Sequence, residues 1–291
     1  MRTSLARGSS RAGASEPSAS TRRMTQPTPA AAPRIETLLP GSMISTDQGE
    51  IAFCSVNLVE ATGSDGRTRR IVIDTGHVGR HQALRQALVS RGLSPSDIDT
   101  VVLTHAHWDH VQNVSLFPAA RVLLHSAELR YARAPHPLDH ATPPWTTAIL
   151  DRNPIVEVTE GDEVARGVTI VEAPGHSPGT LAVAVATAEG AAIVTGDAIQ
   201  DGRVALEGRN ALVFFDEERA NASVRKLVAL AAVIYPGHDR AFRIEAGRLD
   251  YLDPLAMCLT NVRADLEGMS FNPRDDRTPV IMPTARKAQP D

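Results

Sequence analysis

The chain has 291 residues, 42% of them hydrophobic and 22% charged, which is enough to build one large domain with a substantial core. A formal net charge of −4 provides no global basic field, so nucleic acid is not an expected partner. Two distant cysteines, Cys54 and Cys258, favour a reducing compartment over a disulfide framework. The sequence has no run of about 18 apolar residues, so we expect no membrane span. Together these features lead us to expect a cytoplasmic protein.

The two ends of the sequence are predicted to lie outside the folded domain. Residues 1–33 are rich in Ser, Ala, Pro and Arg, so they cannot bury enough apolar surface to offset the entropy of ordering. Their composition resembles a transit peptide, and translation from upstream of a start at Met24 is the alternative explanation. We expect a disordered tail over 1–33, a domain over 34–271 and a flexible tail over 272–291.

Between these tails, short runs of branched apolar residues alternate with segments of helical periodicity. Strands are predicted at 52–61, 69–76, 99–104, 120–125, 168–176, 180–187, 191–197 and, as the last of the series, 233–238. Helices are predicted at 79–92, 126–133 and 216–232, with Gly92 as a C-cap and Asp216 as an N-cap. Many strands with helices between them indicate a layered α/β domain. The Pro-rich segment 131–147 lacks periodicity, which is typical of a functional or mobile loop.

The sequence THAHWDH, residues 104–110, places three histidines and one aspartate where the strand predicted at 99–104 ends. His105 and His107 are two residues apart, so they point the same way in an extended chain, whereas Asp109 and His110 follow where the chain turns. Such a segment can therefore supply ligands to two neighbouring metal ions. Imidazole and carboxylate ligands suit Zn²⁺, and also Fe²⁺ or Mn²⁺.

Three further ligand-type residues each follow a predicted strand and a glycine, where the backbone can turn sharply. They are His176 in APGH, Asp197 in VTGD and His238 in YPGH. A single residue of this kind is more often structural. Three of them downstream of a histidine cluster favour a shared metal site.

The motifs T-H-A-H-W-D-H, G-H-S-P-G, T-G-D and P-G-H, in this order, resemble the metallo-β-lactamase superfamily over roughly residues 38–245. The resemblance implies a four-layer αββα sandwich with the site at one edge between the sheets. The ligands that it implies are His105, His107 and His176 for one metal ion, Asp109, His110 and His238 for a second, and Asp197 as a bridge between the two. It also implies that Asp74, which matches the family's early D-T-G strand end, orients a ligand.

Two divalent ions a few ångströms apart lower the pKa of a water between them from 15.7 to about 7. The metal-bridging hydroxide would then attack the ester or lactone group of a small-molecule substrate, and the ions would stabilise the oxyanion. Asp109 and Asp197 are the candidate catalytic residues, because either carboxylate could orient the water or shuttle its proton. The sequence does not rank one above the other.

The choice of substrate rests on weaker resemblances. The sequence PGHSPGT and the segment between Ala127 and Leu150 resemble the acyl-homoserine lactonases, where the matching segment forms part of the acyl pocket and of a dimer contact. A homodimer is therefore one expectation. Those enzymes carry a tyrosine three residues after the bridging aspartate, where this chain has Gln200, so specificity for homoserine lactones does not follow.

Two other hydrolase classes stay open as alternatives. The first motif also resembles thioester hydrolases of the glyoxalase II type, although these add a helical C-terminal domain. The ending P-G-H-x-x-x-F-R, matched by Pro236 to Arg243, resembles small single-domain relatives linked to RNA processing, which makes a phosphodiesterase or ribonuclease the other alternative. A redox role would need a flavin module, which the sequence lacks.

Several residues without a ligand role could still shape the site. The candidate pocket walls are Phe53, Trp108, Phe117 and Trp145, and side chains of this kind are more often core than substrate contacts. His136 and His140, in the Pro-rich segment, are predicted to be lid residues and not ligands.

Overall fold

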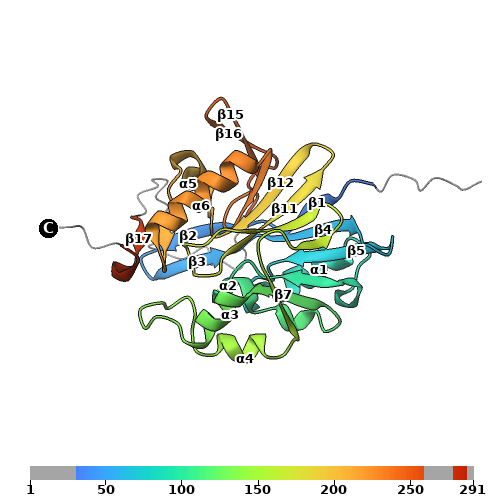
Figure 1. Cartoon of the computed structure of the whole chain (residues 1–291), viewed down its shortest axis with the longest axis horizontal. Helices are drawn as coiled ribbons and strands as arrows, with labels where there is room; N and C mark the ends of the chain where they lie inside the picture. Colours follow the sequence, from blue (N-terminus) through green and yellow to red (C-terminus); the bar gives the residue numbers. More distant parts are fainter. Residues whose placement is uncertain (1–30, 259–277, 287–291) are drawn as a thin grey trace, which may run out of the picture. The chain divides into compact units, whose positions relative to one another are not determined.

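The computed structural model describes residues 31–258 and 278–286, and within these ranges the chain forms two large β-sheets with helices outside them (Figure 1). The first sheet has the strand order β1 (Arg34–Leu39), β4 (Val56–Thr62), β5 (Thr68–Ile73), β6 (Thr100–Val102), β7 (Arg121–His125) and β8 (Ile155–Val158). The second has the order β16 (Arg248–Tyr251), β15 (Phe242–Glu245), β14 (Val233–Pro236), β12 (Gly190–Gly196), β11 (Leu181–Thr187), β10 (Val168–Glu172) and β9 (Glu163–Ala165).

Helices cover the outer side of each sheet, which completes the predicted four-layer αββα sandwich. They are α1 (His81–Val89), α2 (Trp108–Val111), α3 (Ser126–Arg133), α4 (Thr146–Leu150), α5 (Gly202–Glu207) and α6 (Glu217–Leu230). In Figure 1, α5 and α6 lie on one side of the strands and the other four helices on the opposite side. Two small strand pairs are separate from the sheets: β2 (Ser42–Thr46) with β3 (Gly49–Phe53), and β13 (Leu212–Val213) with β17 (Val280–Ile281).

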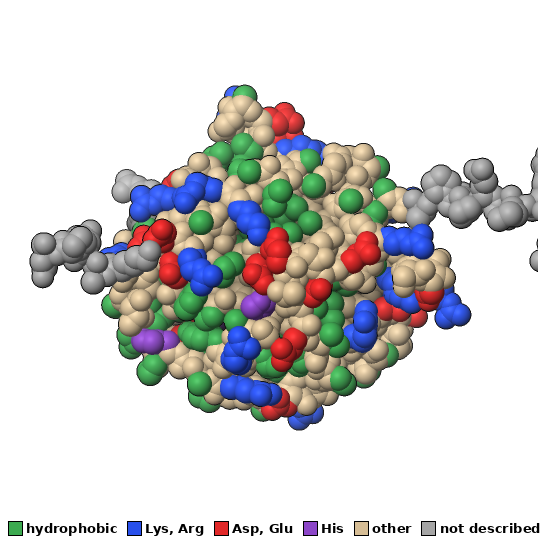
Figure 2. Space-filling model, viewed as in Figure 1, with side chains coloured by type: hydrophobic (Ala, Val, Ile, Leu, Met, Phe, Trp, Pro, Cys, Tyr) green, Lys and Arg blue, Asp and Glu red, His purple; other side chains and the backbone are tan. Residues whose placement is uncertain are grey.

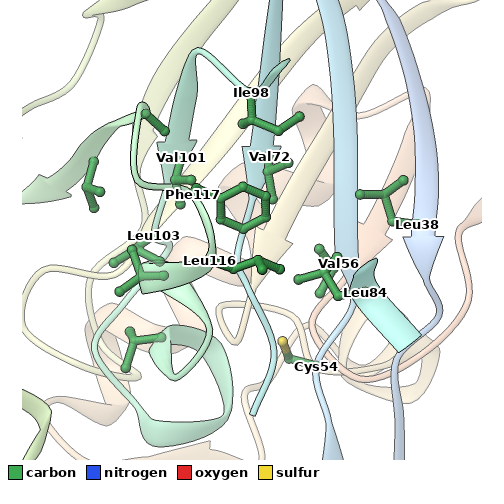
Figure 3. Close-up of a cluster of buried hydrophobic side chains, with 14 of the residues drawn as sticks. Leu38, Cys54, Val56, Val72, Leu84, Ile98, Val101, Leu103, Leu116 and Phe117 are labelled. Carbon is green, nitrogen blue, oxygen red and sulfur yellow. The ribbon is translucent and has the colours of Figure 1, made fainter. Parts of the chain in front are cut away.

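Separate clusters of buried side chains lie between the layers, because strand residues alternate between the two faces of a sheet. In the first sheet, Val101 belongs to the cluster that includes α1, and its neighbour Val102 to the cluster between the sheets. In the second sheet, Val194 lies between the sheets and Ile193 packs with residues of α5 and α6. Figure 3 shows the first cluster, with Leu84 of α1 in it. Full burial of a leucine contributes roughly 1.5–3 kcal/mol, so such contacts hold the helices on the sheets.

The carboxyl ends of several strands meet at one edge of the sandwich. β5 and β6 pair in parallel, as do β12 and β14, and each of these strands is followed by a predicted site residue. Backbone hydrogen bonds join the two sheets at this edge, from Leu181 N to Thr104 O (2.8 Å) and from Ser55 N to Gly237 O (2.6 Å). Polar residues that are far apart in the sequence are therefore brought together there.

Several element boundaries differ from the predictions. The strand predicted over 52–61 is divided, because β3 ends at Phe53 and β4 begins at Val56. Helix α1 ends at Val89 with Ser90 as its C-cap, and Gly92, predicted as the cap, lies two residues further on. The strand at 233–238 is not the last, because β15 and β16 follow it as a hairpin.

The C-terminal segment contains structure that the sequence did not predict. Residues 280–281 form β17 in parallel with β13, and Met282 and Ala285 are buried against α6 and its neighbours. The flexible tail predicted for 272–291 is therefore wrong for residues 280–285. The tail predicted for 1–33 lies outside the described residues up to position 30, as does the span 259–277. No helix in the described part of the chain has the length and apolar character to cross a bilayer.

Candidate metal centre

The structure brings all seven predicted ligands together in two adjacent groups of buried side chains. The first group consists of His105, His107, His176 and Asp197, and the second of Asp109, His110 and His238. Within each group, the candidate ligand atoms lie within 4.8 Å of one another. The loop after β6 and the first turn of α2 supply four of the residues, while the loops after β10, β12 and β14 supply one each.

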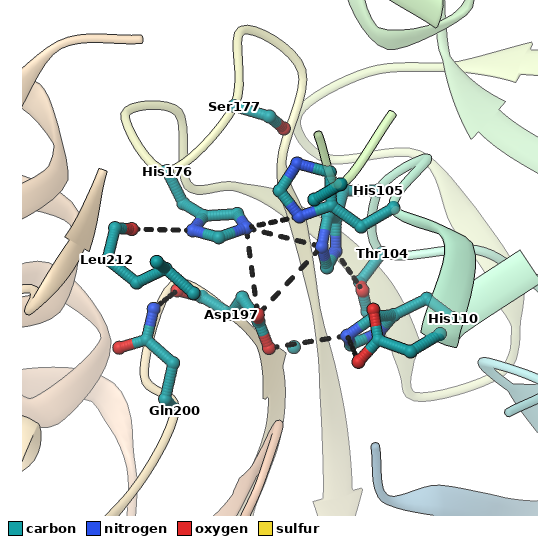
Figure 4. A network of polar contacts seen from close by, with 12 residues as sticks. Thr104, His105, His110, His176, Ser177, Asp197, Gln200 and Leu212 are labelled. Carbon is teal, nitrogen blue, oxygen red and sulfur yellow. Dashed lines mark hydrogen bonds and ion pairs between the residues drawn. The ribbon is translucent and has the colours of Figure 1, made fainter. Parts of the chain in front are cut away.

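The first group converges on His176. Its Nε2 atom lies 3.0 Å from His107 Nδ1 and 3.3 Å from His105 Nε2, and 3.6 Å from Asp197 Oδ2. Figure 4 shows His176 and Asp197 facing His105 across the space between the loops. Three imidazole nitrogens and one carboxylate oxygen therefore surround one point.

The second group shares Asp197 with the first. Asp197 Oδ1 lies 3.2 Å from His238 Nε2 and 3.4 Å from His110 Nε2, while Oδ2 faces the first group. Asp109 Oδ2 completes this group at 3.4 Å from His238 Nε2 and 3.7 Å from His110 Nε2. A carboxylate with one oxygen directed at each group is the arrangement of a bridging ligand.

The donor set fits two bound cations. His110 Nε2 and Asp197 Oδ1 are buried, and neither has a hydrogen-bond partner among the described residues. Buried polar atoms without partners are costly, and ligation of a metal ion would satisfy both. Nitrogen and oxygen ligands in groups of four suit Zn²⁺, Fe²⁺ and Mn²⁺.

In the first group, the electrostatics keep His105, His176 and Asp197 in the forms that bind metals. Burial, reinforced by the neighbouring His107, lowers the pKa of His176 to about 3, and burial also holds the pKa of His105 well below its usual value. These imidazoles are therefore neutral near pH 7, as a metal ligand must be. Burial alone would raise the pKa of the Asp197 carboxyl, but the His238 and His110 imidazoles hold it well below its usual range.

Hydrogen bonds behind the ligands fix which ring nitrogen faces the centre. Asp74 Oδ2 lies 2.9 Å from His110 Nδ1, and the other Asp74 oxygen accepts a hydrogen bond from Thr104 N at 2.8 Å. His176 Nδ1 lies 2.6 Å from Leu212 O, and His238 Nδ1 lies 3.2 Å from the carbonyl oxygen of Phe53. In all three histidines Nε2 is left to face the metal centre, and the predicted orienting role of Asp74 agrees with its geometry.

Glu128 is a buried residue of the site that sequence reasoning missed. Its Oε1 atom accepts a hydrogen bond from Ala106 N (2.9 Å), and its Oε2 atom accepts from Ser177 Oγ (2.7 Å) and Gly179 N (2.9 Å). Ala106 lies between two ligands and Ser177 follows His176, so this carboxylate ties two ligand loops together. A glutamate in the first turn of a predicted helix gave no signal, because its partners are distant in the sequence.

Gln200, three residues after Asp197, lies behind that aspartate. Its Nε2 atom donates to Asp197 O (2.7 Å) and to Asn210 Oδ1 (2.9 Å), and the side chain is buried. Asn210 Nδ2 also donates to Asp197 O at 2.8 Å. Gln200 therefore holds the backbone of Asp197, as Figure 4 shows.

Of the residues predicted as pocket walls, one lies in the hydrophobic core and two lie near the candidate metal centre. Phe117 is fully buried in the cluster under α1, so it is a core residue. Phe53 stacks on His77 with ring centroids 5.4 Å apart, and His77 contacts Trp108 at 5.6 Å, close to the second group. Phe214 was not predicted, yet its ring packs edge-on against His107 at 4.8 Å.

An αββα sandwich with histidine and aspartate ligands at one sheet edge defines a class of metal-dependent hydrolases. The chain belongs to the metallo-beta-lactamase superfamily, whose family model matches residues 51–238. The superfamily resemblance read from the motifs is thereby confirmed.

Among curated proteins, metallo-beta-lactamase domain-containing protein 1 of Homo sapiens is 32% identical to the chain over 189 residues, which are 64% of each protein. The chain thus covers less than two thirds of the length of that relative. An N-acyl homoserine lactonase of Bacillus cereus is 26% identical over 204 residues, or 68% of this chain and 76% of the lactonase.

Solved structures share the fold at lower sequence identity. A Thermotoga maritima protein superposes with a TM-score of 0.59 and 19% identity, covering 73% of this chain and 99% of its own. An N-acyl homoserine lactone hydrolase with the product N-hexanoyl-L-homoserine at its catalytic metal centre has a TM-score of 0.56 and 19% identity, covering 72% and 94%. At this identity the similarity shows the fold alone.

Proposed function

We propose that the chain is a binuclear, zinc-dependent hydrolase that cleaves an ester or lactone bond in a small molecule. The observation that carries the proposal is the shared position of Asp197, whose two oxygens face two separate groups of buried ligands. A single-ion site would leave one of these groups buried without a partner. Fe²⁺ and Mn²⁺ suit the same donors, so metal analysis is part of the test.

The chemistry of the centre divides between the cations and the side chains. Two divalent ions held here would activate a water molecule and polarise the substrate carbonyl. His105, His107 and His176 would hold one ion and His110, Asp109 and His238 the other, with Asp197 shared by both. Asp109 Oδ2 is the carboxylate oxygen nearest the neighbouring histidines, so we assign proton transfer to the other oxygen of this carboxylate.

The relatives and the surface favour a small-molecule substrate. The Bacillus cereus relative is a lactonase by name, and a structural neighbour, an N-acyl homoserine lactone hydrolase, holds its product N-hexanoyl-L-homoserine at its catalytic metal centre. Lys and Arg side chains are interspersed with Asp and Glu on the face shown in Figure 2, which offers no continuous basic surface there for a nucleic acid backbone. Arg240, beside the last motif, stacks on the Tyr251 ring at 3.8 Å. These features favour an ester or lactone over a phosphodiester.

The position of Gln200 limits the substrate further. Its amide group bonds to Asp197 O and Asn210, so it does not replace the tyrosine that the acyl-homoserine lactonases carry there. We therefore expect substrates with good leaving groups, such as aryl esters or activated lactones, to be cleaved faster than homoserine lactones.

The test combines metal analysis with a substrate panel. Purified protein should carry about two zinc ions per chain. The zinc-loaded protein should hydrolyse aryl esters and lactones faster than glutathione thioesters or bis-p-nitrophenyl phosphate. Preference for the phosphodiester would replace the proposed function with the nuclease alternative, and a chain that retains only one ion would refute the binuclear centre.

A further inference from the structure

The segment between α3 and α4, residues 134–145, is irregular and yet attached to the metal centre. Leu138 and Trp145 in it are about half exposed, whereas Asp139 between them is buried. The chain therefore turns one charged residue inward while apolar neighbours face solvent. Burial of a carboxylate is costly unless its oxygens are satisfied, so its partners identify its role.

Asp139 organises the segment through both of its carboxylate oxygens. Oδ1 accepts hydrogen bonds from Ala141 N (2.8 Å) and Thr142 N (3.1 Å). Oδ2 accepts from Tyr131 Oη (2.9 Å) and Thr142 Oγ1 (2.9 Å). Tyr131 belongs to α3, so the segment folds back and closes on the helix that precedes it.

The same Oδ2 atom lies 3.6 Å from Nε2 of the metal ligand His107. His107 directs Nδ1 at the first ligand group, 3.0 Å from His176 Nε2, so Nε2 is the outward nitrogen. That Nε2 atom is buried and has no hydrogen-bond partner among the described residues. A second contact lies beside it, because Trp108 N donates to Ala141 O at 2.9 Å.

We propose that Asp139 is a positioning residue, which holds His107 with Nδ1 toward the first metal ion and attaches segment 134–145 to that ligand. The proposal rests on the binuclear function proposed above. A carboxylate behind a ligating histidine fixes its tautomer and ring orientation and raises its basicity. Because Asp139 also bonds the segment to Tyr131, the positions of the segment and of His107 depend on each other. Occupation of the first group then orders the part of the chain that carries Leu138 and Trp145.

The chain contains its own reporter for this coupling. Its two tryptophans are Trp108, next to His107, and Trp145, at the end of the segment. Because Trp108 also precedes Asp109 of the second group, the titration uses the Trp108→Phe background, in which tryptophan emission comes from Trp145 of the segment alone. Titration of the full-length, metal-free protein with Zn²⁺ should give two binding steps, of which the first-group step changes the emission.

The isosteric variant Asp139→Asn tests the role. We expect its affinity for one of the two ions to fall by about 10–100-fold, the range typical for loss of such a partner, while the other ion binds as in wild type. The emission change should shift to the same higher Zn²⁺ concentration. Tyr131→Phe, which removes one donor to Asp139, should act in the same direction with a smaller effect.

Asp151→Asn is the matched control, because Asp151 is an exposed aspartate just beyond α4. It should leave both binding steps and the emission change at their wild-type values. Unchanged zinc affinities in Asp139→Asn would overturn the proposal. An equal loss of affinity for both ions, together with a lower melting temperature of the metal-free protein, would also overturn it, because that result indicates a purely structural role. Wild-type protein that fails to bind two ions would instead refute the proposed function itself.

Discussion

Asp74 Oδ2 lies 2.9 Å from His110 Nδ1, and the Asp74 backbone is held in the left-handed region with φ of 58°. A residue other than glycine in this conformation is strained, and such strain persists where the surrounding structure imposes it. Asp74→Asn should lower the affinity for the second metal ion about 10–100-fold, because an amide is a poorer partner than a carboxylate for the ligating imidazole. Zinc competition with a chelator measures this, and exposed Asp65→Asn should bind zinc as wild type does.

His105→Ala removes one nitrogen from the first ligand group. We expect hydrolysis to be abolished and the zinc content to fall, because three histidines and Asp197 converge there. Metal analysis and turnover of the same sample provide the measurement. Gln82→Ala is the control, since Gln82 is exposed on α1 and outside both groups; unchanged turnover in metal-quantified His105→Ala would refute the assignment.

Glu128→Gln replaces the carboxylate that ties together the loops of Ala106 and Ser177. A glutamine side chain keeps only one acceptor oxygen. Its NH₂ group replaces the other oxygen and would face the hydrogen-bond donors of one loop, so the bonds to that loop are lost. An unsatisfied buried group costs about 1–3 kcal/mol, which should lower the free energy of unfolding of the metal-free protein. Chemical denaturation should detect this loss, and Glu157→Gln, on an exposed site, should show none.

Gly237 lies so close to the centre that a Cβ atom there would overlap Asp197 Oδ1. Gly237→Ala should push the shared carboxylate away from its position between the ligand groups and weaken both ions together. Gly92→Ala is the control for a general loss of stability. An alanine at the Gly92 φ of 70° costs about 1–2 kcal/mol in stability, but its methyl group meets nothing within 4 Å. Equal zinc affinity in the two variants would contradict the steric argument.

The two cysteines should differ sharply in reactivity. Burial raises the pKa of the Cys54 thiol to about 12, whereas Cys258 is exposed. Because the thiolate is the reactive form, a thiol reagent at about pH 8 should label one cysteine in the native protein and both after denaturation. Cys258→Ser should abolish native labelling; rapid labelling that persists would show that Cys54 is accessible.

The convergence of the seven candidate metal ligands could be predicted from the sequence because each belongs to a short local motif. The roles of Glu128 and Asp139 could not be predicted. Their partners, Ser177 and His107, are distant in the chain and are brought near only by the fold. The β15–β16 hairpin was missed for a local reason. Its two-residue turn places Ala246 at φ 49° before Gly247, where Asn or Asp would have signalled the turn.

The strand pair β13–β17 gives the far end of the chain a role at the centre. Leu212 of β13 pairs with Val280, and the carbonyl oxygen of Leu212 lies 2.6 Å from His176 Nδ1. A protein shortened before residue 280 would keep every candidate ligand and the Leu212 carbonyl, but it would lose the strand that holds this carbonyl in place. Metal content, and not folding alone, is therefore the criterion by which any trimmed version of this protein should be judged.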